Sequence, residues 1–453
     1  MSKKTRIIVD VTQLAHWSGQ ITGIPRVIAE MAKGFYGLTS SDYDVIFAVW
    51  VKDVQELCEI DYVQTIVEHK GLVYKTGDKD VQDQAIHKTA SDDRLSTTSS
   101  SRVYGKTLVK RAVKKGLRVS GRFSPRIANK LEAQAKQMHM RSYRKVVFRK
   151  DDRLFIPWGE WWDQTFTDRV VRAHKEDGVR IVQIIHDVGP TVWPQFFEKV
   201  AVSPSVYNSQ VVPVADLVMA VSENTKRELT GWLKQQKLHI PRIEVFRLGD
   251  SVAIRKPEKP TDEAFVKSGL KGKDFILCVG TIEAKKNHYL LYYVYKLAKQ
   301  RGIKLPKLVI IGRRGFHTDD MYDIMTRDPA VKDDFVFLHD ASDENVSWAY
   351  DHCLFTVLAS FHEGWGIPIA ESIARGVPCL CSNTSSMVEI AEGKGVEHFS
   401  PTSSEECFDG IVRWLDPKKL EAARKKAQTY KPSTWSEAFD QVMTQMEKIN
   451  DKR

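Results

Sequence analysis

The sequence contains few cysteines and no long apolar run. Its six cysteines are scattered and stand mostly in apolar surroundings, which excludes the disulfide framework of a small secreted protein. No apolar stretch approaches the roughly 18 residues that span a bilayer, so a transmembrane helix is not expected. The chain passes from Met1 almost directly into a strand-like segment at Ile7–Val9, without the apolar core of a signal peptide. We therefore expect a cytoplasmic protein.

Clusters of metal-ligating residues are also scarce. Cys379 and Cys381 form a Cys-x-Cys pair in a strand-like run, where alternate side chains point to one face. A metal ion would need further ligands nearby, so two buried small hydrophobic side chains are the better interpretation. The acidic pairs at 319–320 and 333–334 flank helices, and we expect them to be solvated. No metal site is predicted.

Acidic residues are almost missing from one window of the chain. Residues 101–150 hold 16 Lys and Arg and a single acid, Glu132, so that this window carries +15 of a total of +10 and leaves −5 for the rest. The Ser/Thr/Asp-rich stretch Ser91–Ser101 is typical of a flexible loop. We interpret residues of about 76–145 as a basic, partly flexible insert in a mildly acidic protein.

A basic amphipathic helix is predicted within the insert, at Lys106–Val119. Its apolar stripe is formed by Leu108, Val109, Ala112, Val113 and Leu117, and basic residues occupy the remaining faces. Such a helix can lie on an anionic membrane surface, and it can equally pack on its own domain with a solvated basic face. Binding to nucleic acid would require more aromatic residues among the charges, and we do not expect it.

Strand-like runs alternate with helical periodicity along both halves of the chain, which indicates parallel sheets with crossover helices. In the first half the runs are Ile7–Val11, Tyr43–Trp50, Arg153–Pro157, Arg180–His186, Leu217–Val221 and Ile243–Leu248. In the second half they are Phe275–Gly280, Lys307–Gly312, Phe335–Leu338, Leu354–Ala359 and Val377–Ser382. The polar segment Ile254–Glu263 is the expected linker. The pattern predicts an α/β fold with two Rossmann-like, doubly wound domains facing a central cleft.

The most informative motif is the segment from Glu363 to Glu371, in which two glycines and a proline separate two carboxylates. Gly364 and Gly366 would let the backbone approach a ligand closely, and the helix that follows would point its first N–H groups at that ligand. The carboxylates can accept hydrogen bonds from hydroxyl groups. The arrangement favours a molecule with both phosphate and hydroxyl groups, such as a sugar nucleotide, although this spacing also arises by chance and a Gly-x-Gly is often only a tight turn.

Six segments together carry a resemblance to a known family. They are Thr22–Val27, Ile185–Pro190, Ala215–Lys226, Phe275–Asn287, Leu308–Gly315 and Glu363–Glu371, in that order along the chain. The chain resembles a family-4 retaining glycosyltransferase of GT-B architecture, of the type of the bacterial O-antigen and capsule mannosyltransferases. The resemblance implies an acceptor domain at 1–252, a nucleotide-sugar donor domain at 253–433 and a terminal helix at 434–453 that packs back on the first domain.

The resemblance implies roles for particular residues. Glu371 would bind the ribose hydroxyls, while Glu363 and His186 would face the donor sugar. Lys286 would stabilise the leaving nucleoside diphosphate. Glu363, His186 and Lys286 are therefore the predicted catalytic residues. The further predicted donor-binding residues are Gly23, Thr281, Lys285, Arg314, Gly364, Trp365, Gly366 and Ile367. His186 can also be read as a structural residue at a strand end.

The implied reaction transfers a hexose from a nucleotide-sugar to a hydroxyl of a glycan or lipid-linked glycan, with retention of configuration. No enzyme nucleophile, cofactor or metal is expected, and the amino-terminal match favours GDP-mannose as the donor. Such an enzyme would act in the cytoplasm or on the inner face of the membrane. Two alternatives are a non-catalytic protein that binds a partner through residues 101–150, and a sugar-nucleotide epimerase or phosphorylase of the same architecture.

Overall fold

The computed structural model describes residues 4–17, 23–38, 42–68, 72, 143–197, 202–250, 266–270, 272, 274–315, 318–390 and 392–451. Residues Met1–Ile46 and Phe148–Arg453 form one compact unit, and Phe47–Val147 form another. The predicted amphipathic helix at 106–119, the predicted loop at 91–101 and the predicted linker at 254–263 lie outside the described residues. No helix in the described ranges is long and apolar enough to cross a membrane.

The first sheet has the strand order β3-β2-β1-β4-β5-β6-β7. The strands are β1 (Thr5–Asp10), β2 (Tyr43–Val51), β3 (Glu56–Glu59), β4 (Arg153–Ile156), β5 (Arg180–Ile185), β6 (Leu217–Ala220) and β7 (Ile243–Val245). Strands β1 and β4 to β7 pair in parallel, with Ile8 opposite Leu154, whereas β2 and β3 form an antiparallel pair. Parallel strands bring their carboxyl ends to one edge, so the residues after β1, β4 and β5 lie along the same edge.

Six α-helices of the amino-terminal half lie within the described residues. They are α1 (Thr12–His16), α2 (Ile24–Gly37), α5 (Gln164–Lys175), α6 (Gly189–Val192), α7 (Val202–Val211) and α8 (Glu223–Gln235). Asp163 accepts a hydrogen bond from the Thr165 N–H at the start of α5, and Ser222 accepts one from Thr225 at the start of α8. These side chains satisfy N–H groups that have no partner within the helix.

The helix α16 (Trp435–Glu447) packs against α2 near the end of the chain. It begins with a capping box formed by Thr434 and Glu437. The rings of Phe439 and Phe35 meet edge to face with centroids 5.0 Å apart. A side chain at Gly34 would overlap the Phe439 ring, so this glycine allows the two helices to approach closely. The predicted domain boundaries at 252 and 433 stay predictions.

The second sheet is parallel throughout, with the order β10-β9-β8-β11-β12-β13. Its strands are β8 (Phe275–Val279), β9 (Lys307–Ile311), β10 (Phe335–Leu338), β11 (Thr356–Leu358), β12 (Cys379–Ser382) and β13 (Val396–Phe399). The associated helices are α10 (His288–Gln300), α11 (Asp319–Arg327), α12 (Asp343–His352), α13 (Ile367–Ala374), α14 (Ser404–Trp414) and α15 (Pro417–Ala427).

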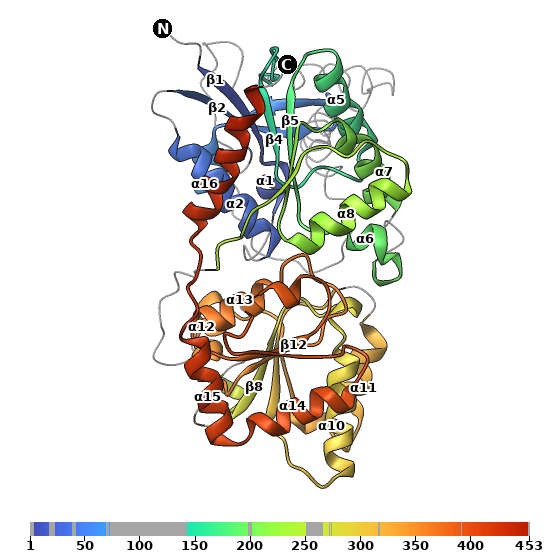
Figure 1. Ribbon diagram of the computed structural model, residues 1–453, viewed down its shortest axis with the longest axis vertical. Coiled ribbons are helices and arrows are strands. Elements are labelled where there is room, and N and C mark those ends of the chain that lie inside the picture. Colours follow the sequence, from blue (N-terminus) through green and yellow to red (C-terminus); the bar gives the residue numbers. More distant parts are fainter. Residues whose placement is uncertain are drawn as a thin grey trace, which may run out of the picture. The chain divides into compact units, whose positions relative to one another are not determined.

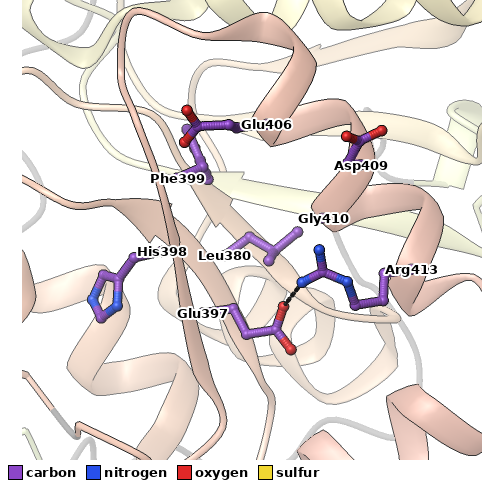
Figure 2. A pocket seen from close by; sticks show the side chains of 8 residues that line it. All are labelled: Leu380, Glu397, His398, Phe399, Glu406, Asp409, Gly410 and Arg413. Atoms are coloured by element: carbon purple, nitrogen blue, oxygen red, sulfur yellow. Dashed lines mark hydrogen bonds and ion pairs between the residues drawn. The ribbon is translucent and has the colours of Figure 1, made fainter.

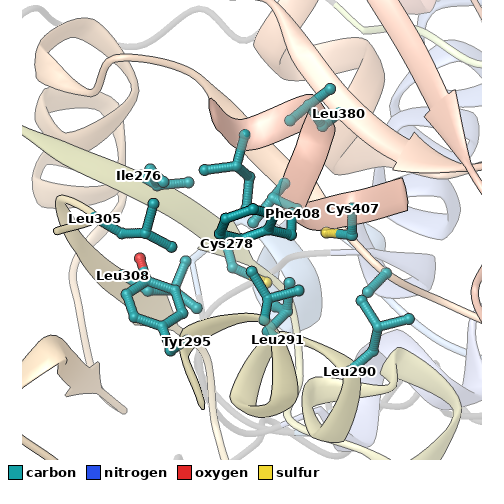
Figure 3. Close-up of a cluster of buried hydrophobic side chains, with 14 of the residues drawn as sticks. Ile276, Cys278, Leu290, Leu291, Tyr295, Leu305, Leu308, Leu380, Cys407 and Phe408 are labelled. Atoms are coloured by element: carbon teal, nitrogen blue, oxygen red, sulfur yellow. The ribbon is translucent and has the colours of Figure 1, made fainter. Parts of the chain in front are cut away.

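Alternate residues of the second sheet enter different cores on its two faces. Ile276 and Cys278 of β8 pack with apolar residues of α10, α11 and α14 (Figures 1 and 3). The neighbouring Leu277 packs with residues of α12 on the opposite face. Cys379 and Cys381 belong to one cluster with residues of α13, as the one-face prediction requires. Two parallel sheets with crossover helices confirm the predicted α/β fold class.

Candidate active site

Glu363 lies in the loop between β11 and α13, where it is held by three polar groups. Its Oε1 atom accepts hydrogen bonds from Ser360 Oγ at 2.6 Å and from Lys286 Nζ at 2.5 Å. Its backbone N–H donates to Ser385 Oγ at 2.9 Å. Burial alone would raise the pKa of Glu363, but the ammonium groups of Lys286 and Lys285 hold it below its usual value. The carboxylate is therefore charged at neutral pH.

The turn after β8 carries Lys286 to this carboxylate. Asn287 ends the turn in the left-handed conformation, with φ of 56°. Its side-chain amide donates hydrogen bonds to the carbonyls of Ala359 at 3.2 Å and Pro401 at 2.8 Å. Asn287 thus ties the loop after β8 to the loop after β11. This tie explains why residues 77 positions apart form an ion pair.

Lys285 lies beside Lys286 and contacts acidic and aromatic groups. Its Nζ atom is 3.8 Å from Asp187 Oδ2 and 5.3 Å from the centroid of the Phe197 ring. Burial would lower the pKa of Lys285, but Asp187, Glu363 and Glu283 raise it above its usual value. Two neighbouring ammonium groups therefore lie beside Glu363, and such a pair could stabilise a diphosphate.

His186 directly follows β5 and carries a defined proton. Its Nε2 atom is 2.7 Å from the Pro157 carbonyl oxygen, which only accepts hydrogen bonds. Burial lowers the pKa of His186 to about 4, so the ring is neutral at physiological pH. The proton is then on Nε2, and Nδ1 is unprotonated. A side chain at Gly364 would lie 1.9 Å from the His186 carbonyl oxygen, so only glycine fits between the two segments.

Glu371 lies in α13, and both of its carboxylate oxygens have partners. Arg26 of α2 donates to Oε1 at 2.8 Å, and the Tyr350 hydroxyl donates to Oε2 at 3.2 Å. The side chain is 12% exposed. Burial raises the pKa of Glu371, and Arg26 offsets this effect only in part. Each carboxylate oxygen has a second lone-pair site that could accept a hydrogen bond from a ribose hydroxyl.

The glycines predicted around these carboxylates have distinct conformations. Gly366 begins α13 with φ of +99°, which favours glycine over any other residue. Gly23 precedes α2 with φ of +59°, and a Cβ there would meet nothing within 4 Å. Glycine is therefore favoured at position 23 by the backbone conformation and not by a lack of space. Of the two residues beside Gly366, Ile367 is half-buried, and Trp365 has a buried Nε1–H without a hydrogen-bond partner among the described residues.

Two predicted site residues contact none of these groups. Arg314 is paired with Asp319, and its guanidinium lies 4.3 Å from the centroid of the Tyr322 ring, both on α11. Thr281 is exposed in the loop after β8. Their predicted contacts with the donor stay predictions.

Two buried carboxyl groups at the edge of the first sheet did not emerge from the sequence. Asp10 ends β1, and burial raises its pKa to about 6 against the opposing effect of its hydrogen bonds from Thr12. Glu160 follows β4, where burial and then the charge of Asp10 raise its pKa to about 7. The available signal was an acid placed directly after an apolar strand, at the same edge as His186.

A shallow polar hollow lies elsewhere in the second domain, between β13 and α14. Figure 2 shows its lining, which includes Leu380, His398, Glu406 and an ion pair of Arg413 with Glu397 at 2.7 Å. None of the predicted site residues lines it. Among the described residues, no group of three or more His, Cys, Asp or Glu side chains is placed to hold a metal ion. The prediction of a metal-free site stays a prediction.

Two α/β sheets of mainly parallel strands, and a carboxylate motif that opens a helix after a β-strand, have the arrangement of the GT-B architecture. Residues 260–430 match the family model described as "Glycosyl transferases group 1", so this part of the chain is a group 1 glycosyltransferase domain. Among solved structures, sucrose-phosphate synthase from Thermosynechococcus elongatus is 13% identical, with a TM-score of 0.61 and 99% coverage of both chains. Anabaena HepE in complex with UDP and glucose is 14% identical, with a TM-score of 0.60 over 98% of this chain and 100% of its own.

Curated relatives to which the chain is similar are mannosyltransferases. O-antigen chain mannosyltransferase B of Escherichia coli is 26% identical over 223 residues, which is 48% of this chain and 56% of the relative. The serotype-specific mannosyltransferase WbdA of Escherichia coli is 21% identical over 280 residues, which is 60% of this chain and 34% of the relative. The matched region thus spans about half of the first relative and a third of the second.

Proposed function

We propose that this protein is a retaining glycosyltransferase that transfers mannose from GDP-mannose to a hydroxyl of a glycan or lipid-linked glycan. The names of two relatives, both mannosyltransferases, support mannose as the sugar, and the name of the first, an O-antigen chain mannosyltransferase, supports polysaccharide synthesis as the pathway class. The enzyme would work in the cytoplasm, on the inner face of the membrane where such acceptors are built. A panel of nucleotide sugars tests the donor directly.

The observation that carries the proposal is the placement of two carboxylates, one in the loop before α13 and one within α13. Glu363 is ion-paired to Lys286, and Glu371 is joined to Arg26 and Tyr350. A carboxylate such as Glu371 can accept both hydrogen bonds of a vicinal diol at the lone-pair sites that Arg26 and Tyr350 do not occupy. Glu363 then faces the sugar, and Lys286 lies between the sugar and the nucleotide.

The chemistry follows from the charges at this position. The bond between the anomeric carbon and the phosphate oxygen breaks, and negative charge develops on the leaving diphosphate. The ammonium groups of Lys286 and Lys285 and the amino-terminal end of α13 stabilise that charge. The acceptor oxygen bonds to the anomeric carbon on the face that the phosphate leaves, and its proton moves to a phosphate oxygen. Configuration is retained without an enzyme nucleophile or a metal ion.

The test is thermal unfolding with a panel of nucleotide sugars, including GDP-mannose and UDP-glucose. A ligand at 100 times its Kd stabilises a protein by about 2.7 kcal/mol, which raises Tm by about 5–10 °C in a domain of this size. Glu371→Ala should remove this shift. Glu397→Ala is the matched control, because Glu397 pairs with Arg413 in the same domain at 2.7 Å.

The product provides the second readout. NMR of the new glycosidic linkage should show the same anomeric configuration as the donor. If no nucleotide sugar raises Tm, or if Glu371→Ala and Glu397→Ala behave alike, the proposed function is wrong. An inverted product would refute the retaining mechanism alone.

A further inference from the structure

Three of the eleven tryptophans of the chain occur within five residues, directly after β4. The rings of Trp158, Trp161 and Trp162 form a continuous series that begins at His186. The centroid distances are 5.5 Å from His186 to Trp158, 5.1 Å from Trp158 to Trp161, and 5.4 Å from Trp161 to Trp162. Trp158 and Trp161 are half-buried, and Trp162 is 47% exposed. The series therefore runs from a predicted catalytic residue outward to solvent.

Buried polar contacts beneath the segment hold its backbone in place. Gly159 has φ of +88°, and a Cβ there would lie 2.6 Å from the Tyr207 hydroxyl oxygen. That hydroxyl donates to Gln183 Oε1 at 2.6 Å, and Gln183 Nε2 donates to the Ile156 carbonyl at 3.1 Å. The segment is thus fixed on the edge of the sheet before any ligand arrives, which lowers the entropic cost of binding.

Polar groups stand among these rings. Glu160 is 6% exposed, and its Oε1 atom accepts a hydrogen bond from Gln13 Nε2 at 2.6 Å. The Nε1–H of Trp158 is buried and has no hydrogen-bond partner among the described residues. A buried donor without a partner is unfavourable and is satisfied when a ligand oxygen reaches it.

Flat aromatic faces combined with a carboxylate and an N–H donor match the chemistry of a sugar. A sugar ring offers a C–H face that can stack on an indole and hydroxyls that can bond the polar groups. Trp162 is 47% exposed beside the half-buried Trp161, so the two indoles together offer aromatic surface to solvent. Continuity with His186 places the surface beside the predicted transfer site.

We propose that Trp158, Glu160, Trp161 and Trp162 form a subsite for an oligosaccharide acceptor, which binds the sugars that precede the one receiving mannose. Trp161 and Trp162 stack on these sugars, and Glu160 accepts hydrogen bonds from their hydroxyls. The inference rests on the proposed function and adds that the acceptor is an extended glycan. A monosaccharide acceptor would not reach from His186 to Trp162.

The test compares acceptors of different length in kinetic assays on the full chain. Methyl α-mannoside and an α-linked mannotetraose serve as acceptors with GDP-mannose as donor. Trp162→Ala should raise the KM for mannotetraose about tenfold, as expected for a lost stacking contact, and leave the KM for methyl α-mannoside unchanged. Trp162→Phe should restore most of the loss, since it keeps an aromatic face.

Two controls separate this inference from folding effects and from the proposed function. Tyr36 lies near the carboxyl-terminal end of α2, and its aromatic side chain is 44% exposed. Tyr36→Ala should leave both KM values unchanged. Hydrolysis of GDP-mannose without acceptor should be equal in all variants. If the wild-type chain does not hydrolyse GDP-mannose, that result would count against the proposed function.

Binding of mannotetraose, followed by tryptophan fluorescence, reads the subsite without turnover. If mannotetraose produces no saturable change in the wild-type chain, the subsite assignment is wrong. It is also wrong if Trp162→Ala changes the KM for both acceptors equally. A fluorescence change that Trp162→Ala abolishes supports the subsite whichever donor is used.

Discussion

Replacing Asp10 with asparagine should make the protein more stable at pH 8 and change little at pH 4. Asp10 is 4% exposed and accepts hydrogen bonds from the N–H and hydroxyl of Thr12. Burial raises its pKa from 3.8 to about 6, in spite of those bonds. A rise of about two pKa units corresponds to about 3 kcal/mol.

The sign follows from the direction of this shift. Below pH 4 the carboxyl is protonated in the folded and the unfolded chain. In the unfolded chain Asp10 ionises near its ordinary pKa of 3.8, whereas in the folded chain it ionises only near pH 6. The wild-type protein therefore loses about 3 kcal/mol of stability as the pH rises between these two values. Asparagine is neutral throughout, and its carbonyl oxygen can still accept from Thr12. At pH 8 the variant should therefore unfold about 6–12 °C higher.

The assay is thermal unfolding of both proteins between pH 4 and pH 8, and the quantity of interest is the difference in Tm at each pH. Taking the difference cancels other titrating groups, except Glu160, whose pKa falls when the Asp10 charge is removed. Asp328→Asn is the control of opposite sign, because hydrogen bonds from Lys296 and Tyr292 lower the pKa of Asp328 to about 2. A Tm difference for Asp10→Asn that does not grow with pH would refute the reasoning.

Three further predictions concern activity. Lys286→Ala should lower kcat by about a hundredfold to a thousandfold, measured as mannosyl transfer, because it removes a charge placed at the leaving diphosphate. Gly364→Ala should abolish transfer and lower the Tm of the free protein, because its Cβ would lie 1.9 Å from the His186 carbonyl oxygen. For Glu160→Gln, the acceptor KM should lose its pH dependence. In the wild type this KM should rise as the pH falls below about 7, because burial and the charges of Asp10 and Asp163 raise the pKa of Glu160 to about 7 against the hydrogen bonds from Gln13 and Trp162.

The parallel architecture could be predicted because buried parallel strands are continuous apolar runs. Phe335–Leu338 has the predicted bounds, and most of the other predicted strands agree with the structure at one end. The predicted Ile7–Val11 and Leu354–Ala359 overlap β1 and β11 but share neither end with them. Two strands were missed. Glu56–Glu59 and Val396–Phe399 are each four residues long and half polar, so their apolar pattern is too short to be distinctive. Their pairing with a neighbouring strand defines them, and that pairing is a tertiary property.

The site shows the same division between local and distant information. The helix that carries Glu371 could be predicted, since Pro368 and Gly376 mark its ends within a few residues. Its partner Arg26 is 345 positions away, and no local pattern connects the two. Arg314, in contrast, has partners that are close to it in the sequence. Its place after β9 suggested a donor contact, but an acid five residues later and a tyrosine ring provide nearer partners.

The acceptor side was harder to predict than the donor side for a topological reason. Asp10 and Glu160 become neighbours because β4 pairs with β1, although a long basic insert separates the two strands in sequence. Because β1, β4 and β5 are neighbours, the residues after β1 and β4 lie at the same edge of the sheet as His186, which follows β5. Most of the predicted donor residues lie within the matched domain, on the loops after β8, β9 and β11, whereas the proposed acceptor subsite depends on the strand order of the first sheet. Specificity for the acceptor is therefore expected to be encoded in residues that local motifs do not reveal.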